Sequence, residues 1–311
     1  GANCYTGPEG FATTHHTAET VATALGVGAI EVQVCSTGLI GLLNDRDTLL
    51  SGVHDALAAR SIDGGAAAAT AIMTTDTVAK EAVSNGEGFT VGGMAKGAGM
   101  LAPALATMLV VITTDADVDA YTADAALRSA TDQTFDRLDS DGCQSTNDTV
   151  LLMASGASGV TPDTDAFTAA VTDVCRDLAM QLLADAEGAD HEIAITVVNA
   201  ASVADALEVG RSVARSNLFK CAIFGKDPNW GRILASVGTT QAAFDPADLD
   251  VALNDVWVCR NSGPGESPDS INLDARAVNV TIDLKSGSAT GTIWTNDLTQ
   301  AYVHENSAYS S

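Results

Sequence analysis

Basic residues are scarce in this sequence. Its 311 residues include 15 Lys and Arg against 40 Asp and Glu, which gives a formal net charge of −25 at pH 7. A surface this acidic repels the phosphate backbone of nucleic acids and the headgroups of anionic membranes. We therefore expect neither nucleic acid nor a membrane as a partner, and we attribute the acidic surface to solubility.

Long apolar runs are also missing. No segment approaches the roughly 18 consecutive apolar residues of a membrane-spanning helix, and the first residues lack the basic and apolar regions of a signal peptide. These absences predict a cytoplasmic protein. The chain opens on the turn-rich segment GANCYTGPEG without a methionine, so we expect it to be an N-terminally truncated piece of a longer protein.

Several common site motifs do not occur. The six cysteines form no CxxC pair and lie mostly in apolar runs, which is typical of buried, reduced thiols. The five histidines are scattered and HExxH is absent, so we expect no metal site. The sequence also lacks GxGxxG, GxxxxGK(S/T) and GxSxG, which argues against the commonest phosphate loops and against an ordinary serine hydrolase.

The residues that are present predict an α/β protein. With 46% hydrophobic residues the chain can bury a large core. Helical periodicity alternates with runs of β-branched residues, which predicts sheets and helices in layers. We expect helices at residues 11–25, 46–60, 119–136, 163–185, 201–216 and 229–238. We expect strands at residues 29–35, 108–113, 192–200, 221–225, 249–259, 277–284 and 289–296.

A glycine-rich segment precedes the strand expected at 108–113. Residues 89–100, FTVGGMAKGAGM, have glycines at positions 92, 93, 97 and 99, which predicts a loop or a distorted strand whose backbone approaches something closely. Thr107 then lies at the edge of the following buried strand. A threonine in that place is usually structural, because threonine favours strands for steric reasons.

A chemical role for Thr107 requires a base, because a threonine hydroxyl is a poor nucleophile. Its own α-amine, with an unperturbed pKa of about 7.7 to 8, would serve if the bond to Ala106 were cut. In a tight, glycine-flanked turn the hydroxyl would attack the Ala106 carbonyl, shift the acyl group from nitrogen to oxygen, and let water release it. The cut would then create the catalyst.

The sequence around Thr107, residues 91–116, resembles the hallmark segment of the ornithine acetyltransferase family of arginine biosynthesis, also called glutamate N-acetyltransferase. Other segments resemble family segments in the family order: CSTGLIG at 35–41, AIMTTDT at 71–77, FDRLDSDGCQSTNDTVLL at 135–152, ADAEG at 184–188, FGKDPNWGRILASVG at 224–238 and ENSAYSS at 305–311. The resemblance covers essentially the whole chain, and STGLIG and the ending are similar to actinobacterial members.

The resemblance implies roles for individual residues. Thr107 is the self-cleavage site, cut from Ala106 to leave residues 1–106 and 107–311, and it is also the nucleophile that accepts the acetyl group. Thr37 and Gly38 form the oxyanion hole, where a hydroxyl and a backbone N–H meet the tetrahedral intermediate. The implied substrate contacts are Thr74, Lys96, Thr107, Glu187, Asn306 and Ser311. Their chemistry suits amino acids, because a lysine, hydroxyls and an amide bind carboxylates while Glu187 pairs with an ammonium group.

The resemblance also implies the fold, the reaction and the assembly. The fold is an ornithine acetyltransferase-like α/β sandwich with an N-terminal lobe, residues 1–160, that contains the cleavage site and oxyanion hole, and a C-terminal lobe, residues 161–311, that completes the pocket. The reaction moves the acetyl group of N2-acetyl-L-ornithine to L-glutamate through acetyl-Thr107, without a cofactor. It leaves open whether acetyl-CoA is a second donor. The assembly is a heterotetramer with two copies of each cleaved chain.

Two departures from the family's pattern adjoin these segments. Asp190 and His191 stand where a Thr-Lys pair is usual, and NDR at 44–46 stands in place of a Leu-Pro-Met run. We expect these changes to affect substrate affinity more than reaction class. Two alternatives stay open: an N-terminal-nucleophile aminopeptidase or amidase that gives the acyl group to water, and an inactive, truncated, acidic binding or structural protein.

Overall fold

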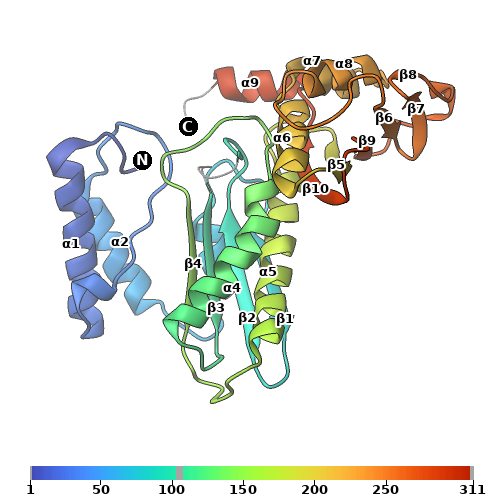
Figure 1. Cartoon of the computed structure of the whole chain (residues 1–311). Coiled ribbons are helices and arrows are strands. Elements are labelled where there is room, and N and C mark those ends of the chain that lie inside the picture. The colour runs from blue at the N-terminus through green and yellow to red at the C-terminus, as the bar shows by residue number, and fades with distance from the viewer. Residues whose placement is uncertain (1, 103–107, 309–311) are drawn as a thin grey trace.

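The strands of the protein form two sheets that helices cover. The computed structural model describes residues 2–102 and 108–308. One sheet has four strands in the order β1-β2-β3-β4, and the other has six in the order β10-β5-β9-β6-β7-β8. The predicted layered α/β fold is therefore confirmed (Figure 1). No helix in the described part of the chain has both the length and the apolar character of a membrane span.

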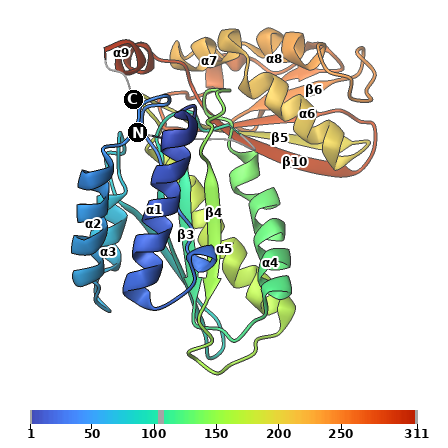
Figure 2. The same cartoon turned by 90° about the vertical axis from the view of Figure 1, so that its left-hand side faces the viewer.

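The first sheet lies between two groups of helices (Figure 2). Its strands are β1 (Lys80–Asn85), β2 (Thr90–Lys96), β3 (Leu109–Thr114) and β4 (Thr149–Ala154). The pairs β1–β2 and β2–β3 are antiparallel, whereas β3 and β4 are parallel. The helices on one side are α4 (Ala120–Gln133) and α5 (Thr164–Ala184), with the short η2 (Phe135–Arg137) after α4. Those on the other side are α1 (Gly7–Leu25), α2 (Arg46–Ala58) and α3 (Gly65–Ala71).

A glycine in β2 lets α5 lie close to the first sheet. Gly93 pairs regularly with both neighbouring strands, so the loop or distorted strand predicted within residues 89–100 is instead a regular strand up to Lys96. A Cβ atom at position 93 would lie 3.0 Å from the side chain of Val174 and 3.1 Å from that of Leu178. Both of these residues belong to α5, so the close backbone approach predicted for this segment is made by that helix.

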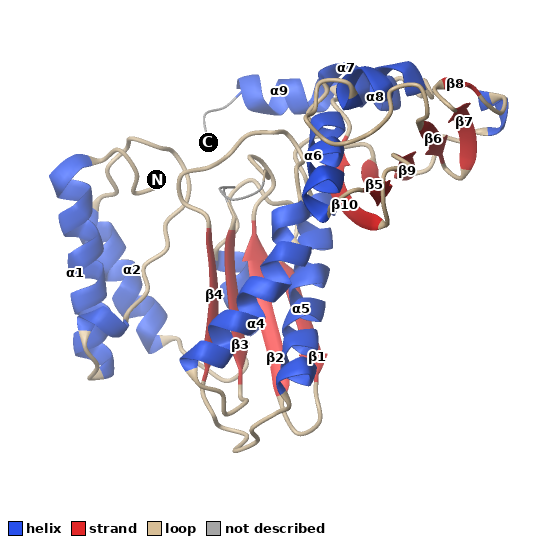
Figure 3. Ribbon diagram, viewed as in Figure 1, coloured by secondary structure: helices blue, strands red, loops and turns tan. Residues whose placement is uncertain are grey.

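The second sheet carries its own helical layer (Figure 3). Its strands are β5 (Glu192–Ala200), β6 (Asp250–Leu253), β7 (Val256–Arg260), β8 (Gly263–Pro264), β9 (Ala277–Asp283) and β10 (Ala289–Asn296). Helix α6 (Val203–Ala214) packs on β5 and β10, and α7 (Asn217–Phe224) and α8 (Trp230–Val237) pack on α6. The short η3 (Pro268–Ser270) contacts β7. The last helix, α9 (Gln300–Ala308), follows β10.

The buried side chains form two clusters, one within residues 82–186 and one within residues 193–293. Helix α5 belongs to the first cluster, because its apolar side chains pack against the first sheet. The change from one cluster to the other therefore falls between Ala186 and Ile193. The division into lobes of residues 1–160 and 161–311 stays a prediction.

Two predicted strands are wrong. Residues 29–35 begin with the 3-10 helix η1 (Ala29–Glu31), and no strand is assigned in that stretch. Ile30 is 91% exposed, so β-branched composition alone did not bring this segment into a sheet. Residues 221–225 lie largely in α7. Ser216 caps that helix by accepting a hydrogen bond from the backbone N–H of Phe219, and Phe219 and Ile223, four residues apart, both face the core.

Candidate functional site

Segments far apart in the sequence enclose a cavity of about 530 Å³. Its lining residues are Gly38, Leu39, Ile40, Thr74, Thr75, Lys96, Ala98, Gly99, Met100, Glu187 and Asn306. Predicted site residues from five segments thus share one cavity: Gly38, Thr74, Lys96, Glu187 and Asn306. The predicted Ala106, Thr107 and Ser311 lie outside the described residues. We call this the substrate cavity below.

The predicted oxyanion turn lies beside the end of β2. Lys96, the last residue of that strand, donates a hydrogen bond from Nζ to Thr37 Oγ1 over 3.2 Å. Gly38 has a φ angle of 113°, a conformation that favours glycine because a Cβ atom would be strained there. Because Thr37 accepts from Lys96, its own hydroxyl hydrogen is directed elsewhere and is suited to a second acceptor.

Lys96 is a buried cation, with only 1% of its surface exposed. Burial lowers its pKa, because the charged ammonium loses its hydration. The carboxylates of Asp76, Asp148 and Glu187 oppose this effect by stabilising the charge, while the neighbouring Lys80 adds to it. The balance leaves the pKa of Lys96 below its usual range, so this side chain gives up a proton more easily than a surface lysine.

Glu187 and Asn306 form the opposite side of the substrate cavity. Asn306 Nδ2, from α9, donates to Glu187 Oε2 over 3.0 Å, and the backbone N–H of Glu187 donates to the carbonyl oxygen of Ala98 over 2.8 Å. A Cβ atom at Gly99 would lie 2.6 Å from Glu187 Oε2. Glycine at position 99 is therefore required for the carboxylate to lie against the backbone that follows β2.

A buried carboxylate that sequence reasoning missed organises the floor of this region. Asp76 accepts hydrogen bonds from the backbone N–H groups of Gly97 over 2.6 Å and Thr74 over 3.1 Å. Lys80 Nζ lies 2.8 Å from Asp76 and 2.6 Å from Asp185, with side-chain exposures of 0%, 0% and 6% for Lys80, Asp76 and Asp185. Burial raises the pKa of Asp76, but these hydrogen bonds and the Lys80 charge outweigh it, so the pKa is lowered and the carboxylate stays charged.

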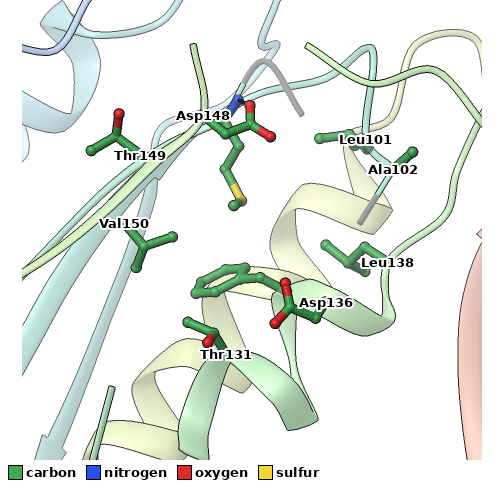
Figure 4. A pocket seen from close by; sticks show the side chains of 10 residues that line it. Leu101, Ala102, Thr131, Asp136, Leu138, Asp148, Thr149 and Val150 are labelled. Atoms are coloured by element: carbon green, nitrogen blue, oxygen red, sulfur yellow. Dashed lines mark hydrogen bonds between the residues drawn. The ribbon is translucent and has the colours of Figure 1, made fainter. Parts of the chain in front are cut away.

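A second, smaller cavity of about 220 Å³ lies between the first sheet and α4 (Figure 4). Apolar side chains make up most of its wall, and two carboxyl groups, Asp136 and Asp148, also line it. Burial raises the pKa of both groups, and that of Asp148 rises to about 7. Sequence reasoning missed Asp148, although it falls within the segment 135–152 that resembles a family segment.

The family comparison was made against this geometry. A model of the ArgJ family matches residues 1–311. The chain belongs to the ArgJ family. This result confirms the family predicted from the sequence motifs.

Curated relatives in the ArgJ family cover the whole of this chain. The chain is 62% identical over 311 residues to the "Arginine biosynthesis bifunctional protein ArgJ" of Streptomyces coelicolor, covering 81% of that protein. It is 60% identical to the protein of the same name from Thermobifida fusca, again covering 81% of the relative. The crystal structure of the ArgJ protein from Bacillus halodurans is similar, with a TM-score of 0.59 and 33% identity, over 65% of this chain and 98% of that one.

The departures from the ArgJ pattern lie away from the substrate cavity. His191 is 5% exposed; its Nδ1 lies 2.7 Å from Asp297 Oδ2 and its Nε2 lies 3.0 Å from the carbonyl oxygen of Leu273. The backbone N–H of Asp190 donates to the same Asp297 side chain over 3.1 Å. In the segment 44–46, Asp45 caps α2 by accepting from the backbone N–H of Thr48. The described contacts of these side chains are structural.

Proposed function

We propose that this chain is a glutamate N-acetyltransferase that moves the acetyl group of N2-acetyl-L-ornithine to L-glutamate. The proposed nucleophile is Thr107, released by self-cleavage between Ala106 and Thr107. The observation that carries the proposal is the substrate cavity, where an oxyanion turn, a buried lysine, a carboxylate and an amide converge from separate segments. Membership of the ArgJ family, whose named relatives are arginine biosynthesis proteins, supports it.

The cavity suits an amino-acid substrate with charges at both ends. Glu187 offers a carboxylate for the side-chain ammonium of acetylornithine, and Asn306 holds one of its oxygens in place. Lys96, Thr74 and the Asn306 amide suit a substrate carboxylate, which accepts hydrogen bonds from ammonium, hydroxyl and amide groups. Ser311 is the remaining residue of the proposed substrate contacts.

The first half of the proposed reaction forms an ester. The Thr107 hydroxyl loses its proton to the α-amine of the same residue and its oxygen attacks the acetyl carbon. The oxyanion that forms is stabilised by the Thr37 hydroxyl and the Gly38 N–H. The bond between the acetyl carbon and the ornithine nitrogen then breaks, and the proton held by the amine passes to that nitrogen, so that ornithine leaves.

The second half reverses these events on a new acceptor. The α-amine of glutamate attacks the acetyl-Thr107 ester, the same turn stabilises the oxyanion, and the Thr107 oxygen leaves and regains a proton. Two moderate barriers replace a single difficult transfer between two amines. Glutamate, with a carboxylate where ornithine has an ammonium, would orient toward Lys96 and the hydroxyl groups.

Three further elements belong to the proposal. We expect two copies of each cleaved chain in a heterotetramer, as the family resemblance implies, and a cytoplasmic location. The relatives are named bifunctional, which supports a second activity, and acetyl-CoA is the donor to test for it. No cofactor takes part in the acyl transfer as proposed.

Intact-mass measurement tests cleavage and acetylation together. We expect the purified protein to consist of two pieces, one ending at Ala106 and one beginning at Thr107, and the second piece to gain one acetyl group when acetylornithine is added. Adding glutamate should remove that group and yield acetylglutamate. The Thr107→Ala variant should remain one chain and form no acetyl-enzyme.

The same measurements separate the alternatives. Release of free acetate at a rate that does not depend on glutamate would favour an amidase. A native protein that stays as a single chain of 31.6 kDa and takes up no acetyl group would favour an inactive binding protein. A Thr107→Ala protein that still cleaved and transferred acetyl would contradict the proposal.

A further inference from the structure

The segment before β4 holds the oxyanion turn in place. Asn147 Nδ2 donates to Ser36 Oγ over 3.1 Å, and the backbone N–H of Asn3 donates to the same oxygen over 2.9 Å. The hydroxyl of Thr146 donates to Asn147 Oδ1 over 2.6 Å, which turns the NH2 end of the amide toward Ser36. Ser36 directly precedes Thr37, so Asn147 restrains the turn that carries the proposed oxyanion donors.

The next two residues hold the beginning of β3. Asp148 Oδ1 accepts a hydrogen bond from the backbone N–H of Met108 over 3.0 Å, and the backbone N–H of Thr149 donates to the Met108 carbonyl oxygen over 3.0 Å. The parallel ladder of β3 and β4 starts one residue later, where Leu109 pairs with Thr149. A side-chain carboxylate therefore takes the place of a strand partner at Met108.

The surroundings of Asp148 make this contact costly to keep. Asp148 faces the smaller cavity beside Met108 and Val150, where most of the wall is apolar (Figure 4). Burial raises its pKa to about 7, although the hydrogen bond from Met108 and the charge of Lys96 oppose that effect. A carboxylate in such a place is more often functional than structural, because an apolar side chain would fill the space without the desolvation penalty.

We propose that Asn147 and Asp148 are positioning residues that align the nucleophile strand with the oxyanion turn. This inference rests on the proposed function, because Met108 is bonded to Thr107 and Ser36 to Thr37. One short segment thus holds both neighbours of the reacting groups, and the distance between nucleophile and oxyanion donors depends on it. Misplacement of reacting groups by about 1 Å typically costs about 10²-fold in rate.

Rates of maturation and turnover test the inference in the full chain. For Asp148→Ala we expect self-cleavage and kcat to fall by about 100-fold, with the KM for acetylornithine within about twofold of native, because the substrate cavity is unchanged. Asn147→Ala should act in the same direction with a smaller loss, since Asn3 still contacts Ser36. The matched control is Asp136→Ala, which removes a carboxyl from the same cavity and should leave both rates near native.

The pH dependence of self-cleavage separates positioning by Asp148 from general loss of structure. Self-cleavage precedes the free α-amine of Thr107, so that amine does not contribute to it. Lys96 of β2 is the cation that acts on Asp148, and Asp136 of η2 shares its cavity. Protonation of Asp148 removes a charge-assisted bond to Met108, so we expect the native rate to fall as pH drops through about 7. Asp148→Asn keeps an acceptor oxygen but not the titration, and its rate should be nearly independent of pH there.

Each outcome decides between the two proposals. Asp148 variants that mature and turn over like the Asp136 control, beside an active native chain, would overturn this inference alone. If Asp148→Ala shows no cooperative unfolding, Asp148→Asn decides, and a native pH profile in that variant overturns the inference. A native chain that neither cleaves nor transfers acetyl overturns the proposed function and this inference with it.

Discussion

The two sheets of the protein differ in how they use polar groups. Buried charged pairs and carboxyl groups with shifted pKa values lie around the ends of the first sheet, among them Lys80, Lys96 and Asp148. The middle strands of the second sheet instead bury apolar side chains almost completely, with exposures of 0 to 1% for Ile195, Val280 and Ile293. The difference indicates that the first sheet carries the chemistry and the second provides a stable framework.

The largest effect should come from breaking a buried ion pair at the first sheet. Lys80→Ala leaves the buried carboxylates of Asp76 and Asp185 without their cation, which should lower the free energy of unfolding by about 3–5 kcal/mol. Denaturant unfolding measures this change. The matched control at the second sheet is Lys226→Ala, which removes an exposed pair with Asp274 and should change stability little. Equal effects of the two variants would remove the contrast between the sheets.

The next effect concerns rate rather than stability. Thr37→Ala removes one proposed oxyanion donor and should lower kcat by about 10²–10³-fold, because such donors stabilise charge that develops only in the transition state. Single-turnover acetylation of Thr107 measures it, and the unfolding midpoint should stay near native because Thr37 lies in a loop. Thr37→Ser keeps a hydroxyl and should recover most of the rate. If alanine and serine behave alike, Thr37 is not a donor.

The smallest effect belongs to the second sheet. Ile195→Val removes one buried methylene group from β5 and should cost about 0.5–1.5 kcal/mol of stability. Because Ile195 lies in the second cluster and not in the substrate cavity, kcat and KM should stay unchanged. Thermal unfolding and steady-state kinetics on the same sample check both parts. A loss of activity larger than the loss of folded protein would show that the framework also sets the geometry of the site.

The sequence allowed most elements of this comparison to be predicted, for physical reasons. Strand 192–200 was predicted with its observed bounds, because a run of buried β-branched residues is a strong local signal. Residues 221–225 have a similar apolar composition, but the cap at Ser216 and the four-residue spacing of Phe219 and Ile223 make them helical. Local composition could not distinguish the two cases, and the capping contact does.

The site was predictable only in part. Resemblance to the family supplied Gly38, Lys96 and Glu187, which the structure brings to one cavity. The supporting groups were not predicted, because their partners are distant in the chain: Lys80 lies 105 residues from Asp185, and Asp148 lies 40 residues from Met108. No local pattern contains such a contact, since it exists only after the strands have assembled.

Helix α5 connects the packing of the first sheet mechanically to the substrate cavity. With 21 residues and a rise of about 1.5 Å per residue it is a rigid strut of roughly 30 Å, and Asp185 and Glu187 follow directly at its end. Asp185 is fastened to Lys80 and Thr77, which fixes where the strut ends. The position of the Glu187 carboxylate is thus set along the whole length of the helix, so that a tilt caused by a bulkier residue at Gly93, well before the cavity, would be felt as a changed preference among amino-acid substrates.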